Sequence, residues 1–448
     1  MKKLKPTIQE LHRARAAGAL LTSLVLVACG GGGSGGGSGS PAALTASALA
    51  AAPSASSTPS TSSDPSDPSN PSTPSTPSTP STPSTPSGPS TPDAPAAPGS
   101  SEPASASTSS SLSGGFAGEV TGGGKAAAIT VSTAAQMQAA IDAYSGTGGL
   151  VIRYNGTFDF SSITDACTQW QLPAGAIVEI EDKSDITIEG ADNSSANFGL
   201  AIKADAANII IRNMTIGLLP GSIDAIGIEG QGGNFPGHIW IDHNTLFSSL
   251  KECPGAGDLE FDGLLDNKAG AHHITYSYNH IHDHHKVGLI GSSDSDSSDR
   301  FITFHHNVYQ NVGSRLPLQR GGYTHLYNNL YSGVITSGAN IRMGGFSLIE
   351  GNYFENSKNP VTSRDSSAIG FWELRNNNIK TPADFSTFGI TWVASSSSPS
   401  RDASDWITTG TFPVAIPYAY TAQDPACVKQ KLPTVAGAGK ALASLTCN

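Results

Sequence analysis

The chain has 448 residues, a formal net charge of −11 at pH 7 and 14% charged residues, compared with about 25% in an average globular protein. Its prolines are unevenly spread, because 16 of the 29 lie between Pro41 and Pro103, so the composition averages two unlike parts. No apolar run approaches the roughly 20 residues of a membrane-spanning helix, which excludes a polytopic membrane protein. The acidic balance also argues against a nucleic-acid-binding protein, which needs a basic face.

The N-terminus has the order of an export signal, with lysines and arginines followed by the apolar stretch Ala16–Ala28. The stretch ends in Leu26-Val27-Ala28-Cys29, which resembles the lipobox of bacterial lipoproteins, in which the cysteine is lipidated. The sequence therefore predicts a lipoprotein-type signal over residues 1–29, with Cys29 as a membrane anchor. An ordinary signal peptide that contains a cysteine is the alternative.

Residues 30–113 show no hydrophobic periodicity. They are rich in Gly and Ser up to Ser40, and Ser-Thr-Pro triplets dominate Ser63–Pro92. Such a composition cannot bury enough apolar surface to offset the entropy of ordering. We predict a disordered linker, which starts flexible and becomes more extended in its proline-rich part.

Residues 114–448 are predicted to form one folded domain. A helix is expected over Ala134–Tyr144, with Ser132 or Thr133 as its N-cap. Short β-rich runs follow. They are Leu150–Tyr154, Ala176–Ile180, Asp185–Ile188, Ile209–Ile211 and His238–Ile241.

These runs share an ending in which an asparagine precedes aliphatic or aromatic residues. The asparagines are Asn213, Asn244, Asn279, Asn307, Asn329, Asn352 and Asn377. A repeat of about 22 residues with variable excess is typical of a solenoid with loops inserted into some coils. Asparagine suits the turn because it tolerates the left-handed conformation and can hydrogen-bond to its counterpart in the next coil. The pattern predicts an all-β fold, a right-handed parallel β-helix with a short N-terminal capping helix and inserted loops.

The cysteines agree with an exported domain. With Cys29 assigned to the lipid, four remain, an even number. Cys427 and Cys447 are expected to close the C-terminal segment, which pairs Cys167 with Cys253 by elimination. Free buried thiols are the alternative.

Acidic residues gather where the inserted loops are expected. They are Asp224, Asp262 and Asp266, the last two in the run Phe261-Asp-Gly-Leu-Leu-Asp266. Carboxylates at loop ends suit a hard cation such as Ca²⁺. A glycosidase acid–base pair and solvated surface charges are the alternatives.

Histidines and basic residues fill the same region. Eleven of the 12 histidines lie between His238 and His325, and His282 and His284 would share a strand face, although no cysteine is near to complete a zinc site. The basic cluster comprises Lys268, Lys286, Arg315, Arg320 and Arg342. Together with the acidic cluster it predicts a site for a polyanion, held by fixed cations and bridging Ca²⁺. Salt-bridged structural arginines are the alternative.

From about Gly124 to Asn448 the chain resembles the bacterial pectate lyases of polysaccharide lyase family 1, especially the pectate lyase C type. The segments that carry the resemblance are Ser194–Gly199, Ile239–Asn244, Lys286–Leu289, Arg315–Gly322, Asn359–Arg364 and Thr381–Ser386. The Arg-x-Pro-x-x-Arg run that starts at Arg315 is the most specific of them.

The resemblance implies calcium-dependent β-elimination of polygalacturonate, which leaves 4,5-unsaturated oligogalacturonates. It assigns Arg315 as the base, with Lys286 and Arg320 as its cationic neighbours. The implied substrate contacts are Lys268, Lys286, Arg320 and Arg342, and the implied Ca²⁺ ligands are Asp224, Asp262 and Asp266. Because an arginine is charged at ordinary pH, the assignment implies activity that rises into alkaline pH.

Three positions depart from the C-type pattern. Ser222 stands where relatives have an aspartate, Asp262 replaces a glutamate, and the loop Gly230–Gly237 is longer. Alternative functions are a pectin lyase on methylated substrate, a polygalacturonase, and a non-catalytic surface β-helix that binds carbohydrate. We expect an exported monomer that binds no nucleic acid and is either held at the outer membrane through Cys29 or released to the extracellular space.

Overall fold

The computed structural model describes residues 112–167, 176–219, 221, 223–254 and 261–447. The predicted signal, the lipidation site Cys29 and the linker as far as residue 111 lie outside the described residues, as does Ser222. No helix in the described part of the chain is long and apolar enough to cross a membrane.

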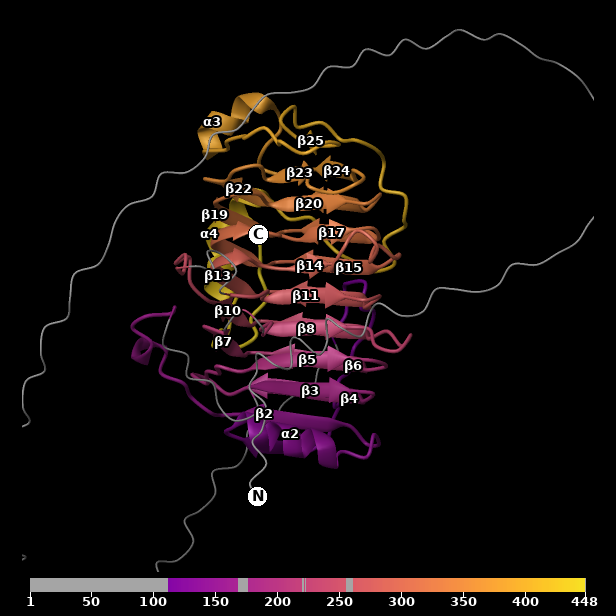
Figure 1. Ribbon diagram of the computed structural model, residues 1–448, viewed down its shortest axis with the longest axis vertical. Coiled ribbons are helices and arrows are strands. Elements are labelled where there is room, and N and C mark those ends of the chain that lie inside the picture. The colour runs from indigo at the N-terminus through magenta and orange to yellow at the C-terminus, as the bar shows by residue number, and fades with distance from the viewer. Residues whose placement is uncertain (1–111, 168–175, 220, 222, 255–260, 448) are drawn as a thin grey trace, which may run out of the picture. The chain divides into compact units, whose positions relative to one another are not determined.

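The described strands form three long sheets of ten, nine and six strands that stack coil upon coil (Figure 1). The ten-stranded sheet comprises β1 (Ala128–Val131), β2 (Leu150–Tyr154), β4 (Ser184–Gly190), β6 (Ala207–Arg212), β9 (Gly237–Asp242), β12 (His272–Ser277), β15 (Phe301–His305), β18 (Tyr323–Tyr327), β21 (Phe346–Glu350) and β24 (Phe371–Arg375). The nine-stranded sheet comprises β3 (Ile177–Glu181), β5 (Gly199–Lys203), β8 (Ile226–Glu229), β11 (Leu265–Lys268), β14 (Leu289–Ile290), β17 (Leu318–Arg320), β20 (Ala339–Arg342), β23 (Val361–Ser363) and β25 (Arg401–Asp402). The six-stranded sheet comprises β7 (Thr215–Gly217), β10 (Thr245–Phe247), β13 (His280–Lys286), β16 (Val308–Ser314), β19 (Leu330–Val334) and β22 (Tyr353–Glu355).

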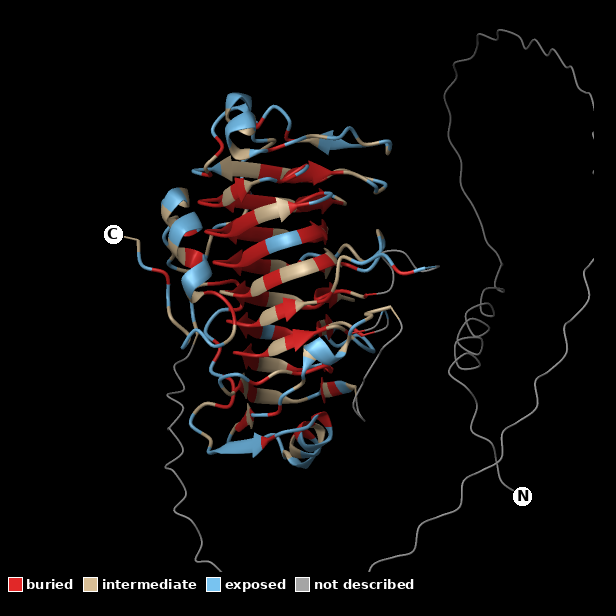
Figure 2. Cartoon of the chain, turned by 90° about the vertical axis from the view of Figure 1, so that its left-hand side faces the viewer, coloured by how far each residue is buried: buried red, intermediate tan, exposed pale blue. Residues whose placement is uncertain are grey.

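Neighbouring strands of these sheets are parallel, except that β25 pairs antiparallel with β23. The predicted right-handed parallel β-helix is therefore confirmed. Inward side chains of the three sheets form one continuous apolar core, which includes Ile188, Ile211, Ile241 and Ile274 at 0% exposure. Figure 2 shows these buried strands inside a more exposed set of loops and helices.

The helix expected over Ala134–Tyr144 is α2, Ala134–Ala143, which covers the N-terminal end of the coil (Figure 1). Its N-cap is Thr133, whose hydroxyl oxygen accepts a hydrogen bond from the Gln136 backbone N–H. The strand predicted over Leu150–Tyr154 is β2 with the same bounds, and the other four predicted strands overlap β3, β4, β6 and β9. Shorter helical segments are η1 (Phe160–Ser162), η2 (Pro382–Asp384), α3 (Phe385–Phe388) and α4 (Pro425–Val435).

A buried ladder of asparagine side chains follows the turn between the ten-stranded and six-stranded sheets. Each side-chain amide donates to the next side-chain oxygen, at 3.0 Å from Asn244 to Asn279 and 2.9 Å from Asn279 to Asn307. The ladder continues through Asn329 and Asn352 to Asn377. These bonds satisfy polar groups that the turn would otherwise bury unpaired.

The prediction for Asn213 was wrong by one residue. Thr215 pairs with Thr245, so Met214 takes the ladder position, and its backbone N–H donates to the Asn244 side chain. Asn213 lies beside His243, and both have positive φ, 56° and 52°. The left-handed residue is therefore the one before the ladder position. At the ladder position itself, asparagine is favoured by its side-chain hydrogen bonds and not by tolerance of the left-handed conformation.

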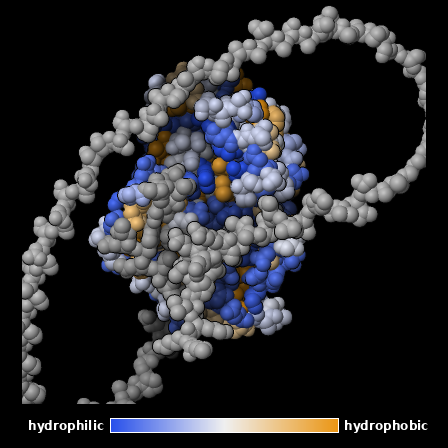
Figure 3. Space-filling view, in the orientation of Figure 1, coloured by the Kyte–Doolittle hydropathy of each residue, from blue (hydrophilic) through white to orange (hydrophobic). Residues whose placement is uncertain are grey.

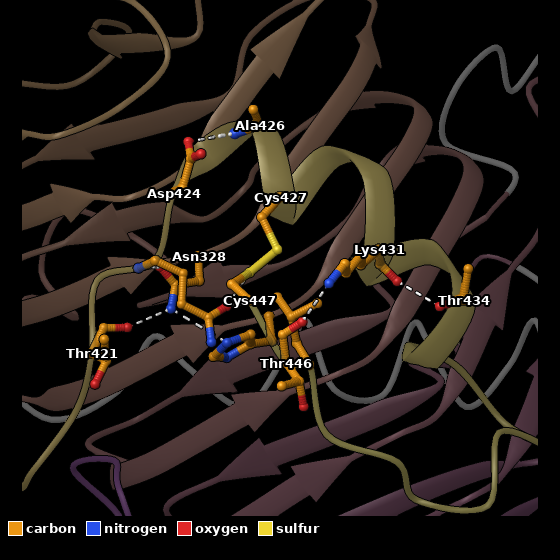
Figure 4. Close-up of a disulfide and its surroundings, with 12 residues drawn as sticks. Asn328, Thr421, Asp424, Ala426, Cys427, Lys431, Thr434, Thr446 and Cys447 are labelled. Carbon is orange, nitrogen blue, oxygen red and sulfur yellow. Dashed lines mark hydrogen bonds between the residues drawn. A yellow bond between two sulfur atoms is a disulfide. The ribbon is translucent and has the colours of Figure 1, made fainter.

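Two disulfides fix segments outside the coil. Cys167 and Cys253 are joined with 5.4 Å between their Cα atoms, and Cys427 and Cys447 with 6.0 Å. The second bond ties α4 to the C-terminal segment, where the Lys431 ammonium also donates to the Thr446 carbonyl (Figure 4). Val428 and Leu432 of α4 pack on Val308 and Leu330 of the six-stranded sheet.

Candidate active site

The outward face of the nine-stranded sheet collects the charged residues that the sequence singled out. Side chains alternate across a strand, so in β11 Leu265 points into the core while Asp266 and Lys268 share the outer face. In the same way Arg320 of β17 pairs in register with Arg342 of β20. β8, β11, β14, β17 and β20 are successive neighbours in the sheet, and at about 4.8 Å per strand they span about 19 Å.

The loops that enter this sheet supply the remaining residues. Asp224 precedes β8, Asp262 precedes β11, and Lys286 ends β13 just before β14. Arg315 lies in the turn between β16 and β17. The face turned to the viewer in Figure 1, where β8, β11, β14 and β17 are labelled, is mostly hydrophilic where described atoms are visible in Figure 3.

The acidic end of the face is a cage of three carboxylates. Oxygens of Asp224, Asp262 and Asp266 all lie within 4.8 Å of one another. Ca²⁺ binds oxygens at 2.3–2.6 Å, so one ion can touch all three. The Asp224 Oδ1 atom is buried without a hydrogen-bond partner among the described residues, as expected of an oxygen reserved for a cation. Gly263 leaves room for the cage, because a Cβ there would lie 2.3 Å from Asp266 Oδ1.

The electrostatics of the cage also fit a cation. Burial, together with the neighbouring Asp266 carboxylate, raises the pKa of Asp224 to about 7. Burial likewise raises the pKa of Asp266, against the opposing effect of Lys268. Asp266 is held in place by the Leu289 backbone N–H, which donates to its Oδ1 at 3.0 Å. Two buried carboxylates at this separation require positive charge between them.

Lys268 supplies that charge within the chain. Its ammonium lies 2.7 Å from Asp224 Oδ2 and 3.3 Å from Asp266 Oδ2. Burial alone would lower the pKa of Lys268, but Asp266 and Asp224 raise it above its ordinary value. The sequence predicted Lys268 as a substrate contact, and the structure places it against the carboxylate cage.

The other end of the face is cationic. Arg342 is buried, and burial together with Arg320 lowers its pKa to about 10. Its Nη1 donates to the Asp365 carbonyl at 2.8 Å, and its Nε has no hydrogen-bond partner among the described residues. The Arg320 Nη1 donates to the Gly291 carbonyl at 2.7 Å. Acid at one end and fixed cations at the other suit a chain of carboxylates bound along the coil axis.

Arg315 lies between the two ends in a constrained turn. Its φ is +67°, a conformation that costs a non-glycine residue on the order of 1–3 kcal/mol. Its charge acts on Asp266 on one side and on Arg342 on the other. The constrained turn therefore fixes the point from which the Arg315 side chain leaves the backbone, between the acidic and the cationic end.

The comparisons with known proteins agree with this geometry. Residues 101–441 match the pectate lyase family. Pectate lyase 3 of Pectobacterium carotovorum subsp. carotovorum is 45% identical over 361 residues, which cover 76% of this chain and 94% of that protein. Pectate lyase B of Dickeya chrysanthemi is 45% identical over 348 residues, covering 72% and 90%.

The chain belongs to the pectate lyase family. Among solved structures, pectate lyase II of Xanthomonas campestris shows 51% identity and a TM-score of 0.69, covering 74% of this chain and 99% of that one. Pectate lyase C of Erwinia chrysanthemi, solved at pH 9.5 with Ca²⁺, shows 42% identity and a TM-score of 0.69, covering 75% and 99%. The protein is thus a polysaccharide lyase with pectate lyase activity.

Within this pectate lyase fold, the two histidines that the sequence singled out, His282 and His284, make contacts within the chain. His284 is buried, and burial lowers its pKa to about 3. Its Nε2 donates to the Lys286 carbonyl at 2.9 Å, so its Nδ1 accepts from the Ser248 hydroxyl. His282 pairs with Asp283. Over the described residues the carboxylate trio is the only cluster with metal-ligand geometry.

Sequence reasoning missed the acidic residues that hold the cations. Asp294 accepts a hydrogen bond from Arg320 Nε at 3.2 Å, and Asp365 pairs with Arg342 at 3.7 Å. Asp294 stands in the run Gly291-Ser-Ser-Asp-Ser-Asp296, which is typical of a solvated surface loop. Only the fold, which brings this loop beside β17, identifies it as part of the site.

Proposed function

We propose that this protein cleaves the α-1,4 linkages of polygalacturonate by calcium-dependent β-elimination, releasing 4,5-unsaturated oligogalacturonates. The observation that carries the proposal is the arrangement of one outer face, where three carboxylates within 4.8 Å of one another are followed by fixed cations on successive coils. A polyanion fits such a face because cations bind its carboxylates directly and a bridging cation joins the remaining ones to the enzyme. The solved complex of a pectate lyase C mutant with pentagalacturonic acid, at 42% identity, supports this substrate class.

The proposed Ca²⁺ ligands are Asp224, Asp262 and Asp266. When bound there, Ca²⁺ would neutralise a C6 carboxylate and so acidify the neighbouring C5 proton. Arg342 and Arg320 hold neighbouring carboxylates and fix the register of the sugar chain. Lys268 is paired with Asp224 and Asp266 of the cage, so its proposed contact with substrate requires its ammonium to leave these carboxylates, which the entry of Ca²⁺ would favour.

The proposed base is Arg315. In its neutral form the guanidine takes the C5 proton, the electron pair forms the C4–C5 double bond, and the C4–O bond breaks, with the departing oxygen taking a proton from solvent to become a hydroxyl. Its cationic neighbours are Arg320 and Lys286, which is buried at the end of β13 in the preceding coil. Positive charge on both sides favours the neutral guanidine by like-charge repulsion, so the rate should rise into alkaline pH.

Asp266→Ala tests the calcium site. Asp266 is 1% exposed, so folding is first checked by circular dichroism. The variant should lose at least 100-fold in turnover at low Ca²⁺ on polygalacturonate. Full activity of a folded Asp266→Ala protein in chelator would remove calcium from the mechanism. Faster cleavage of highly methylated pectin than of polygalacturonate would point to pectin lyase activity.

We also propose the organisation of the N-terminal part and the location of the protein. Residues 1–29 act as a lipoprotein signal, Cys29 carries the lipid, and residues 30–113 link it to the lyase domain at 114–448, which acts as an exported monomer. The Leu-Val-Ala-Cys run and the Ser-Thr-Pro repeats support this organisation. Metabolic labelling with a fatty acid should mark the wild-type protein and leave Cys29→Ser unlabelled; labelling of neither would overturn the anchor.

A further inference from the structure

We propose that Asp294 is a positioning residue, which acts through Arg320 to fix the cationic end of the substrate face. The inference rests on the proposed role of Arg320 as a substrate contact. Asp294 lies in the loop between β14 and β15, and both of its carboxylate oxygens are engaged by groups from other coils.

The Asp294 carboxylate bridges two separate segments. Its Oδ1 accepts from Arg320 Nε at 3.2 Å and from the Ser366 hydroxyl at 2.6 Å. Its Oδ2 accepts from the backbone N–H and the hydroxyl of Ser367, both at 2.8 Å. These hydrogen bonds lower the pKa of the Asp294 carboxyl, so it remains charged across the working pH range.

The bridge leaves one edge of the Arg320 guanidinium for a ligand. Nε is held by Asp294, and Nη1 donates to the Gly291 carbonyl at 2.7 Å. Nη2 has no partner among the described residues, and a guanidinium offers its N–H groups in one rigid plane. Two fixed points therefore orient that plane, and the remaining N–H pair faces outward in a set direction.

The loop that carries Asp294 is itself anchored at its base. Asp296 accepts a hydrogen bond at 2.8 Å from the backbone N–H of Ala269, the residue after Lys268. Asp296 also forms an ion pair with the buried Arg300. Gly291 has φ +87°, and a Cβ there would lie 2.1 Å from the Asp296 carbonyl. These contacts hold the base of the loop, so the loop can support the Arg320 side chain.

The same bridge reaches the second arginine. Ser366 and Ser367 follow Asp365 directly, and Asp365 is the residue that holds Arg342 through its carbonyl and carboxylate. Arg320 and Arg342 lie in register on neighbouring strands, and Arg320 is among the groups that lower the pKa of Arg342. One carboxylate thus orients one arginine, anchors the loop of the other and offsets the repulsion between them.

Asp294→Asn breaks this bridge and keeps the size of the side chain. An amide has one oxygen and one NH₂ group, whereas the site presents donors on both sides. If the oxygen faces Ser367, the NH₂ faces the Arg320 Nε–H; if it is flipped, the NH₂ faces the Ser367 N–H. Either orientation sets a donor against a donor, so Arg320 loses its orientation.

The test is a double-mutant cycle of Asp294→Asn and Arg320→Ala, with Asp283→Asn as the control. Asp283 is a half-exposed carboxylate at positive φ, where Asn is equally suited, and its partners are His282 and Asn311. Binding of an oligogalacturonate is measured by calorimetry with Ca²⁺, and KM and kcat are measured on polygalacturonate. Circular dichroism and the melting temperature verify folding.

Asp294→Asn should weaken binding and raise KM about 10-fold, with kcat changed less than threefold. In the Arg320→Ala background it should add less than a twofold effect, because the residue on which it acts is gone. Asp283→Asn should match the wild type. If Asp294→Asn does not fold, Ser367→Ala takes its place in the cycle, with an expected factor of about three.

No change in Asp294→Asn, or the same factor with and without Arg320, would overturn the positioning role. The binding arm does not need turnover. A wild-type protein that binds the oligogalacturonate but does not cleave it would therefore contradict the proposed function while the cycle still reports on Asp294.

Discussion

Lys268→Met tests whether the lysine acts as a built-in counter-ion of the carboxylate cage. Methionine keeps most of the aliphatic side chain and removes only the ammonium, which lies 2.7 Å from Asp224 and 3.3 Å from Asp266. The side chains of Lys268, Asp224 and Asp266 are 21%, 15% and 2% exposed. The variant therefore leaves two largely buried carboxylates without their internal cation.

The magnitude follows from that burial. Removing one partner of a fully buried ion pair costs about 3–5 kcal/mol. Because the Lys268 side chain is partly exposed, we expect a loss of about 2 kcal/mol in the free energy of unfolding, measured in chelator at pH 9. The loss should be smaller at pH 5, since the pKa of Asp224, raised to about 7 by burial and Asp266, leaves this carboxyl protonated there.

The assay is urea unfolding with chelator and with Ca²⁺. Calcium binds the folded cage and stabilises it, and it replaces the missing ammonium, so the deficit of Lys268→Met should shrink to below about 1 kcal/mol in Ca²⁺. Lys203→Met is the control, because Lys203 pairs with Glu179 on the same sheet and their side chains are 28% and 43% exposed. We expect it to cost about 0–1 kcal/mol in both conditions. An equal deficit for Lys268→Met with and without Ca²⁺, or no deficit in chelator, would refute the counter-ion role.

The remaining predictions concern calcium, the base and the ladder. The pKa of Asp224 is raised to about 7 in the folded chain. This shift stabilises the folded chain below pH 4, and the stabilisation is lost as the pH rises through about 7. Ca²⁺, in contrast, binds the ionised carboxylate. Calorimetry should therefore find calcium binding weaker at pH 5.5 than at pH 8.5, on the order of 30-fold, with proton release below pH 7; equal affinities would contradict the burial argument. Arg315→Lys should lower kcat by about 10²–10⁴-fold and leave KM within threefold, and unchanged turnover would reject Arg315 as the base. Asn307→Ala removes one hydrogen-bond partner from the side-chain amide of each buried neighbour, Asn279 and Asn329. It should lower the free energy of unfolding in urea by about 2–4 kcal/mol. A loss of less than about 0.5 kcal/mol would contradict the stabilising role of the ladder.

The β-helix was predictable because the same type of side chain recurs once per coil. Asn244, Asn279 and Asn307 mark the turn with buried side-chain hydrogen bonds, and such bonds need the same residue in every coil. Asn213 misled the register because the repeat changes there to Met214, which donates only its backbone N–H. A sequence pattern cannot identify a ladder position at which only a backbone group makes the hydrogen bond.

The charged face was only partly predictable. Asp224, Asp262 and Asp266 are close in sequence or lie in neighbouring coils, so their meeting in one cage follows from the coil repeat. The ion pairs of Lys268 with that cage do not follow, because alternation along β11 gives only the face, whereas the position of the ammonium depends on the conformation of a long side chain. The role of Asp294 could not be predicted from the sequence either, because the fold alone brings its loop beside Arg320 and Ser367.

The most direct test of the central claim is the growth of ultraviolet absorbance when the protein is mixed with polygalacturonate and Ca²⁺. The absorbance reports the C4–C5 double bond that β-elimination creates and hydrolysis does not. We predict that it rises steadily, faster at pH 9 than at pH 6, and stops when chelator is added. Chain cleavage without any rise in absorbance, or a rise that continues in chelator with its maximum near pH 5, would contradict a calcium-dependent lyase with an arginine base.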